Sequence, residues 1–198
     1  MPKTLKLKSD IFNIELSYIL DERLRKNTKI ILDLLPDYFY EVPATSSGKY
    51  HPEFAQGTCG LVRHTKVAVR IAKELLGLEF SSEKFTNNEK DLIIISILLH
   101  DALKSGLDYS EHTKFEHPLI IADFIKDNKD KTTFTDKEIK FISDGISSHM
   151  GEWNKSSYSK VELPKPMTKH QRFIHMCDYL SSKKFLDVKF DKENNLIS

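Results

Sequence analysis

His100 and Asp101 form a polar pair at the end of a strongly apolar segment, directly after Leu98 and Leu99. Neutral imidazole and ionised carboxylate are common ligands of a divalent cation, and polar groups against a buried helix need a compensating partner. The alternative is a histidine and an aspartate that face solvent at a helix end. The pair therefore predicts a metal site only if further ligands join it.

Further candidate ligands lie on other predicted helices or at their boundaries: His64, His117, His149 and Asp178. Together, four imidazoles and two carboxylates suit Fe, Mn, Zn, Co or Ni, with Mg also compatible, better than Ca, which prefers oxygen ligands alone. Six ligands suggest two divalent metal ions. Asp101 would bridge them, with His64, His100 and Asp178 on one metal and His117 and His149 on the other. A water between two such metals becomes a nucleophile near neutral pH.

The alternative is a structural helical bundle with scattered histidines. A helical chain with 8 histidines places some of them on inward faces by chance, and in that case the six residues would not converge. His175, three residues before Asp178, competes for a ligand role, but we expect it on a neighbouring helix face, in a supporting or structural position.

Helical periodicity predicts the elements that carry these residues. A helix over residues 61–76, which ends at Gly77, places His64 in its first turns. Thr86 and Glu89 have the spacing of a capping box and open a segment that is apolar nearly all round. Such a helix belongs at the centre of the fold, and it delivers His100 and Asp101 at its carboxyl end.

The remaining helices are predicted from their start signals. Pro118 suits the first turn of a helix that begins at His117, Thr135 and Glu138 form a second capping box, and Thr168 caps a last helix. Near the amino terminus, a pattern from Ser9 to Leu20 predicts one amphipathic helix, and a second helix follows and ends before Pro36.

Composition predicts an all-α protein. The 198 residues, 39% hydrophobic and 30% charged, suit one helix-rich domain over 1–198, with a small β-hairpin over residues 186–197. A net charge of +1 argues against a dedicated duplex-DNA binder. The 2 cysteines exclude a disulfide framework, and we find no signal peptide and no membrane span. We therefore expect a cytoplasmic protein, and the oligomeric state is left open.

The series His64, His100-Asp101 and Asp178 resembles the defining pattern of the HD-domain metal-dependent phosphohydrolases, which are all-helical enzymes that hydrolyse phosphate esters. His117 and His149 match the extra ligands of the dinuclear branch of that superfamily. The resemblance covers about residues 43–184, and Leu103 departs from it where the family often has glycine. It implies an HD-domain helical bundle that binds a divalent metal.

A narrower likeness is to the HD domain of bacterial 3′-to-5′ exoribonucleases. It rests on Pro43-Ala44, on Tyr50 to Pro52, on Gly60 to Thr65, and on Ser148-His149 with Trp153. The 198 residues leave no room for the OB fold of those enzymes, which is expected to hold single-stranded nucleic acid. We therefore expect the hydrolytic centre of those enzymes without their domain for binding single-stranded nucleic acid.

Several residues are candidates for catalysis or substrate binding. Asp101 would orient the nucleophile, and the resemblance implies that Lys104 faces the phosphate. A loop before His64 offers Ser47, Lys49 and His51 to an anionic ligand. Arg63 suits a phosphate clamp and an ordinary surface arginine equally, and Trp153 is a candidate for stacking on a base.

These observations predict a metal-dependent phosphohydrolase, a phosphatase or phosphodiesterase that uses a metal-activated hydroxide on a nucleotide or a related phosphate ester. One alternative is a short 3′-to-5′ exonuclease or oligonucleotide hydrolase, which would need a basic, aromatic-lined groove and would bind short single-stranded nucleic acid. Another is a non-catalytic HD nucleotide sensor, which an intact ligand set disfavours.

Overall fold

The fold is built around one buried helix, α5 (Asn87–Leu99). The computed structural model describes residues 7–45, 51–79, 84–185 and 188–197. Every residue of α5 from Asp91 to Leu99 is buried, which confirms the central position predicted from its uniform apolarity. The predicted capping box is present, because Thr86 Oγ1 accepts from the Glu89 amide at 3.2 Å and the Glu89 carboxylate accepts from the Thr86 amide at 2.8 Å.

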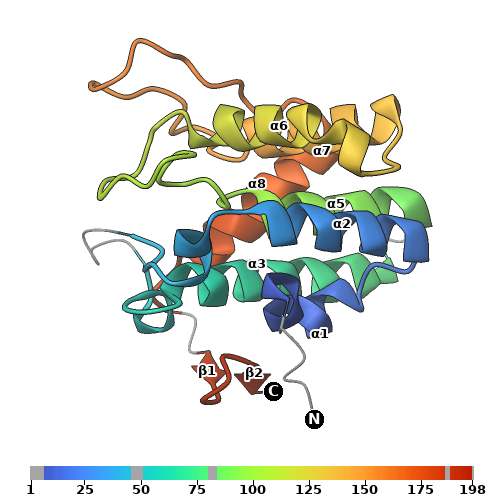
Figure 1. The fold of residues 1–198 in the computed structure, drawn as a ribbon, viewed down its shortest axis with the longest axis horizontal. Coiled ribbons are helices and arrows are strands. Elements are labelled where there is room, and N and C mark those ends of the chain that lie inside the picture. Colours follow the sequence, from blue (N-terminus) through green and yellow to red (C-terminus); the bar gives the residue numbers. More distant parts are fainter. Residues whose placement is uncertain (1–6, 46–50, 80–83, 186–187, 198) are drawn as a thin grey trace.

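Four further helices build the bundle with α5: α3 (Gly60–Gly77), α6 (His117–Asp127), α7 (Asp136–Ser147) and α8 (Lys169–Ser181). α5 packs against α3, α7 and α8, whereas α6 packs against α7 and α3 against α8. Figure 1 shows α6 and α7 as one layer above α5, α3 below it, and α8 crossing behind. The predicted cap of α7 by Thr135 and that of α8 by Thr168 are confirmed.

The amino-terminal segment departs from the prediction of a single helix. It forms a 3-10 helix (Lys8–Phe12) and the short α1 (Asn13–Leu16), and the chain then turns into α2 (Glu22–Leu34). The turn is fixed from far along the chain, because both Asp91 carboxylate oxygens accept backbone amides, from Leu20 and from Asp21, each at 2.9 Å. The side chain of Asp21 in turn caps α2.

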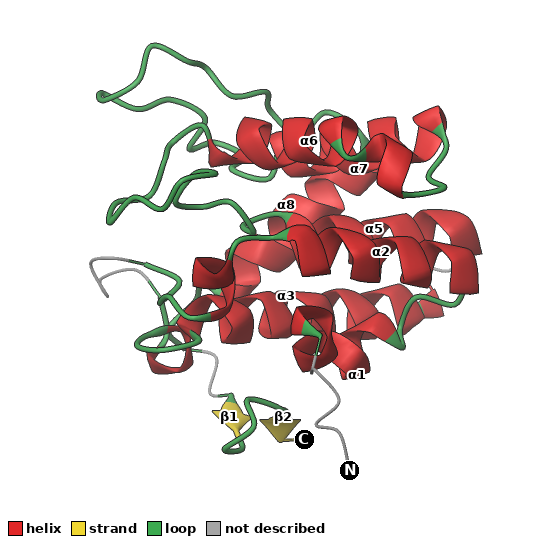
Figure 2. Ribbon diagram, in the orientation of Figure 1, coloured by secondary structure: helices red, strands yellow, loops and turns green. Residues whose placement is uncertain are grey.

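The remaining elements are short. Three 3-10 helices cover Asp37–Tyr40, Glu53–Ala55 and Lys129–Lys131. The predicted carboxyl-terminal hairpin is present as β1 (Lys189–Phe190) paired antiparallel with β2 (Leu196–Ile197). Figure 2 shows these strands as the small yellow exception in a helical fold, which confirms the all-α class. Among the described residues, no helix is long and apolar enough to cross a membrane.

The loops that carry functional residues gather at one end of the bundle. In Figure 1 the segments before α3, between α5 and α6, and between α7 and α8 all extend to the left. Gly60 lets the first of these segments pack closely on α3, because a Cβ there would lie 2.3 Å from the carbonyl oxygen of Ala55. That segment closes on itself through a 2.9 Å hydrogen bond from the Ala44 amide to the same carbonyl.

Candidate metal centre

The structure brings the six predicted ligands together. His64 lies near the start of α3, His100 and Asp101 follow α5, His117 begins α6, His149 follows α7, and Asp178 lies in α8. Ligand atoms of His64, His100 and Asp101 lie within 4.8 Å of one another, and the same holds for Asp101, His117 and His149. Five separate helices therefore converge on one buried polar centre.

One half of the centre lies between α3, α5 and α8. The Nε2 atoms of His64 and His100 are 3.3 Å apart, and Asp178 Oδ1 lies 3.1 Å from the first and 3.4 Å from the second. Asp101 Oδ2 lies 3.6 Å from both imidazole atoms. Four ligand atoms thus face a common point.

The other half uses the second oxygen of the same aspartate. Asp101 Oδ1 lies 2.9 Å from His117 Nε2 and 3.6 Å from His149 Nε2, and these two Nε2 atoms are 3.3 Å apart. The carboxylate of Asp101 therefore turns one oxygen to each group of histidines.

Hydrogen bonds at the far nitrogen orient three of the imidazoles. Nδ1 of His100 lies 2.7 Å from the carbonyl oxygen of Ile97, and Nδ1 of His117 and of His149 lies 2.8 Å from the carbonyl oxygen three residues earlier, at Lys114 and Ile146. A carbonyl oxygen only accepts, so Nδ1 carries the proton and Nε2 presents its lone pair to the centre.

Ser181 orients the fourth imidazole and was not singled out from the sequence. Its hydroxyl donates to the carbonyl oxygen of Asp178 at 2.7 Å, and it therefore accepts from His64 Nδ1 at 3.2 Å. The available signal was spacing, since Ser181 lies three residues after Asp178 and so near it on the surface of α8.

The protonation states of the centre fit a cation. Burial lowers the pKa of His64 and of His117, which favours their neutral form. Burial also opposes the charge of Asp101 and Asp178, yet Lys104 and His100 hold the pKa of the Asp101 carboxyl well below the usual range, and His100 and His64 do the same for Asp178. Neutral imidazoles and ionised carboxylates are the forms that bind divalent metals.

The raised pKa of His100 also shows that the centre favours a positive charge. Burial opposes its protonation, but Asp101 and Asp178 raise its pKa to about 9. With lone pairs and carboxylate oxygens converging from every side, a divalent cation satisfies the centre better than one shared proton does. The residues present therefore fit a metal site.

Lys104 lies at the edge of this centre. Its Nζ is 2.6 Å from Asp101 Oδ2, and its side chain is 15% exposed. The Lys104 ammonium is thus held next to the carboxylate that both halves share, and part of the side chain is open to solvent.

The loop before α3 brings His51 to the centre as well. Its ring centroid lies 5.0 Å from that of His64 in an edge-to-face arrangement, and its buried Nδ1 atom has no hydrogen-bond partner. Burial and the nearby charges of His64 and Lys104 lower the pKa of His51 to about 3. The predicted substrate ligands Ser47 and Lys49 lie outside the described residues.

Arg63 is directed away from the ligand set. It donates from Nε to the carbonyl oxygen of Phe54, from Nη2 to that of Gln56 at 2.7 Å, and from Nη1 to the Asn194 side chain at 2.7 Å. Arg63 therefore ties the loop before α3 to the carboxyl-terminal hairpin, and burial lowers its pKa.

Trp153 lies on the surface next to two metal-ligand segments. The residue is 49% exposed, and its ring stacks on that of Tyr179, with centroids 5.7 Å apart and an interplanar angle of 13°. Tyr179 directly follows Asp178, and the sequence offered no reason to select it. His175 lies beside both rings and donates from Nδ1 to the carbonyl oxygen of His149 at 2.7 Å, which agrees with a supporting position.

Gly151 makes this arrangement possible. It has a φ of +61°, and a Cβ there would lie 2.2 Å from the ring of His175. The chain can therefore leave His149, turn tightly over His175 and bring Trp153 onto Tyr179.

Comparison with known proteins decides the family. A model of the HD domain matches residues 61–183, more than half of the chain. The chain belongs to the HD-domain family. HD domains are generally metal-dependent phosphohydrolases, and the matched region contains all six candidate ligands. The narrower likeness to exoribonuclease HD domains is not supported, since the match is to the HD domain in general. No curated protein and no solved structure matches the chain.

Proposed function

We propose that this HD-domain protein is a phosphohydrolase with two metals, which cleaves a phosphate ester bond of a nucleotide or a related phosphomonoester or phosphodiester. The observation that carries the proposal is the position of Asp101, whose two carboxylate oxygens face two separate groups of histidines. A bridging carboxylate is the simplest use of that arrangement. The chemistry that divalent metals supply in such a site is a hydroxide nucleophile near neutral pH and neutralisation of charge on the phosphate.

Lys104 has a role in charge stabilisation under this proposal. Its ammonium lies against Asp101 and is partly exposed, so a phosphoryl oxygen that enters from solvent meets a fixed positive charge beside the metal ligands. A preorganised cation favours the transition state, in which negative charge builds up on the phosphoryl oxygens.

Trp153 and Tyr179 support a nucleotide as the substrate. The stacked pair is exposed, and each ring is close in sequence to a ligand, with His149 four residues before Trp153 and Asp178 directly before Tyr179. Aromatic rings near a phosphate-binding centre suit stacking on a base. The same pair favours short oligonucleotides as a second candidate substrate.

The test joins metal analysis to a hydrolysis screen. Purified protein is analysed for bound metal and assayed on bis(4-nitrophenyl) phosphate, 4-nitrophenyl phosphate, nucleotides, cyclic nucleotides and short oligonucleotides. We expect metal-dependent turnover that Asp101→Ala abolishes, while Asp123→Ala, at an exposed position on α6, leaves it unchanged. Wild-type protein without bound metal and without metal-dependent turnover would overturn the proposal and favour a non-catalytic sensor.

A further inference from the structure

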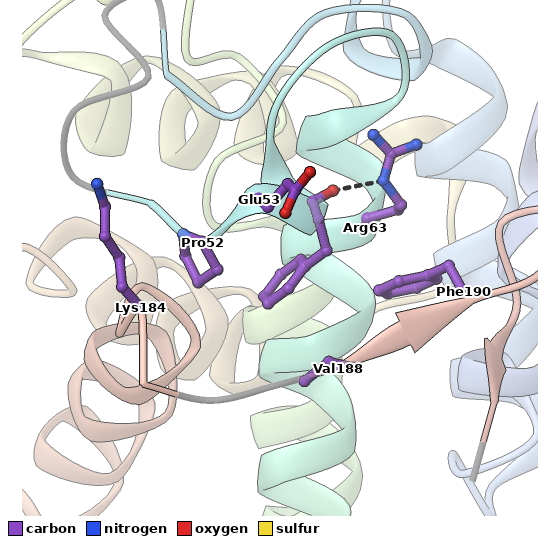
Figure 3. Close-up of a pocket in the computed structure, with 7 residues that line it drawn as sticks. Pro52, Glu53, Arg63, Lys184, Val188 and Phe190 are labelled. Atoms are coloured by element: carbon purple, nitrogen blue, oxygen red, sulfur yellow. Dashed lines mark hydrogen bonds between the residues drawn. The ribbon is translucent and has the colours of Figure 1, made fainter.

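A cavity lies beside the loop that carries His51. It has a volume of about 450 Å³ and is lined by residues from the loop, α3, the segment after α8 and the hairpin: Pro52, Glu53, Phe54, Arg63, Lys184, Val188 and Phe190. Figure 3 shows Lys184 and Pro52 on one side and Arg63 and Phe190 on the other. None of the six metal ligands is among these lining residues.

The apolar part of this cavity is aromatic. The rings of Phe54 and Phe190 lie 5.8 Å apart at an interplanar angle of 40°, and Val188 and Pro52 extend the apolar surface. Arg63 fixes both walls, because it hydrogen-bonds the carbonyl oxygen of Phe54 and the side chain of Asn194. The rings therefore offer a preformed surface on which a planar ring can stack.

The polar part presents one group of each charge. Among the described residues, neither the carboxylate of Glu53 nor the ammonium of Lys184 has an ion-pair or hydrogen-bond partner, and both line the cavity. A carboxylate accepts two parallel N–H bonds from a planar edge, and an ammonium attracts an anion. A matching ligand has an aromatic body, adjacent N–H donors and a negative group.

We propose that this cavity is an effector site for a nucleoside monophosphate, with guanine as the preferred base. The base stacks on Phe54 and Phe190, guanine N1–H and its 2-amino group donate to Glu53, and the phosphate lies against Lys184. Hypoxanthine lacks the 2-amino donor and adenine lacks both the N1–H and the 2-amino donor, so each binds Glu53 less well than guanine does. The cavity volume accommodates a ligand of this size.

The cavity is connected to the metal centre through one short segment. Pro52 lines the cavity and directly follows His51, whose ring packs against that of the metal ligand His64. A ligand that holds the Pro52–Phe54 wall therefore also restricts His51. We expect occupancy to change the hydrolytic rate, and this part of the inference rests on the proposed function.

Binding is tested by calorimetric titration of the full chain with GMP, IMP, AMP and guanosine. We expect GMP to bind about tenfold more tightly than the other three, in wild type and equally in Asp101→Asn, whose metal centre is impaired. Glu53→Gln should reduce GMP binding to the AMP level, and Lys184→Gln to the guanosine level. Lys189→Gln and Glu193→Gln, on exposed hairpin residues that do not line the cavity, should have no effect.

Three results would overturn all or part of the inference. Equal affinity for GMP in wild type and in both cavity variants would show that the nucleotide binds elsewhere. GMP binding that leaves the rate on bis(4-nitrophenyl) phosphate unchanged would contradict the connection through His51. Turnover without GMP binding would leave the proposed function intact and reject only the effector site. GMP binding without any turnover would leave the nucleotide site intact and reject the proposed function.

Discussion

The hydroxyl of Ser181 accepts a hydrogen bond from His64 across the contact between α8 and α3, with Oγ 3.2 Å from Nδ1. Since the hydroxyl proton is used at the carbonyl oxygen of Asp178, this bond leaves His64 with its lone pair on Nε2, which faces the metal centre.

Replacing Ser181 by alanine should weaken metal binding about 10- to 100-fold, because the His64 ring loses the partner that fixes its orientation and tautomer. The measurement is metal affinity by competition with a chelator of known strength. Ser182→Ala is the matched control, since its hydroxyl donates to the carbonyl oxygen of Tyr179 on the same helix and contacts no ligand. Equal affinity in both variants would remove Ser181 from the site.

Removing a ligand of one half, and in a second variant the aspartate that both halves share, should distinguish two metals from one. His117→Ala should reduce the bound metal from two ions per chain to one, since only the group around Asp101 Oδ1 is lost. Asp101→Asn should remove both, because the carboxylate that the two halves share loses its negative charge and one of its two oxygens. Elemental analysis of purified protein gives the ratio, with the exposed His112→Ala as control. Unchanged metal content in His117→Ala would contradict a two-metal centre.

Metal binding should also raise the melting temperature of the wild-type protein. At a free metal concentration about 100-fold above the dissociation constant, the native state gains about 2.7 kcal/mol. For a chain of this length that corresponds to roughly 5–10 °C, which a thermal-shift assay resolves. A chelator should abolish the gain, and Asp101→Asn should not show it. Equal melting temperatures of wild type with and without Mn, Zn, Fe or Mg would contradict a metal centre.

Trp153 provides a direct optical signal of base stacking, since the chain has 1 tryptophan. AMP should quench its fluorescence, whereas ribose 5-phosphate, which lacks a base, should not. Tyr179→Leu should weaken AMP binding about 5- to 100-fold, since stacking contributes roughly 1–3 kcal/mol per base. Tyr158→Leu, in the same loop and 98% exposed, is the control. Quenching of equal strength by ribose 5-phosphate would rule out base stacking on Trp153 and Tyr179.

Acid should destabilise the fold in part through Glu138. Burial opposes the charge of its carboxylate, but hydrogen bonds from Arg23 and from the Thr135 amide lower its pKa. A carboxyl with a depressed native pKa stabilises the fold above its unfolded pKa of about 4.5 and loses that contribution as pH falls. Glu138→Gln should lower the melting temperature at pH 7 and make it less sensitive to pH between about 5 and 3. Glu152→Gln, which is exposed, should behave like wild type.

The parts of the fold that local signals specify were predicted from the sequence. The capping boxes at Thr86 and Thr135 depend on residues three positions apart, and the uniform apolarity of α5 requires burial whatever its neighbours are. The positions of the ligands followed, because each lies in or next to a helix whose start or end was marked in the sequence.

The remaining features depend on contacts between distant segments. The turn after α1 is held by Asp91, about 70 residues away, and no property of the local sequence indicates it. Likewise, Arg63 was equally consistent with a phosphate clamp, and only its contact with Asn194 shows how the structure uses it. The pairing of Trp153 with Tyr179 also depends on how the loop after α7 lies against α8.

The four imidazoles differ in how easily mutation can disturb them. His100, His117 and His149 are oriented by main-chain carbonyl oxygens, which remain when the side chain at the supporting position changes. His64 relies on a hydroxyl, and most single substitutions at Ser181 remove it. The hydrogen bonds that orient the first three histidines therefore do not depend on the identity of the supporting side chain, whereas the one that orients His64 depends on a single hydroxyl.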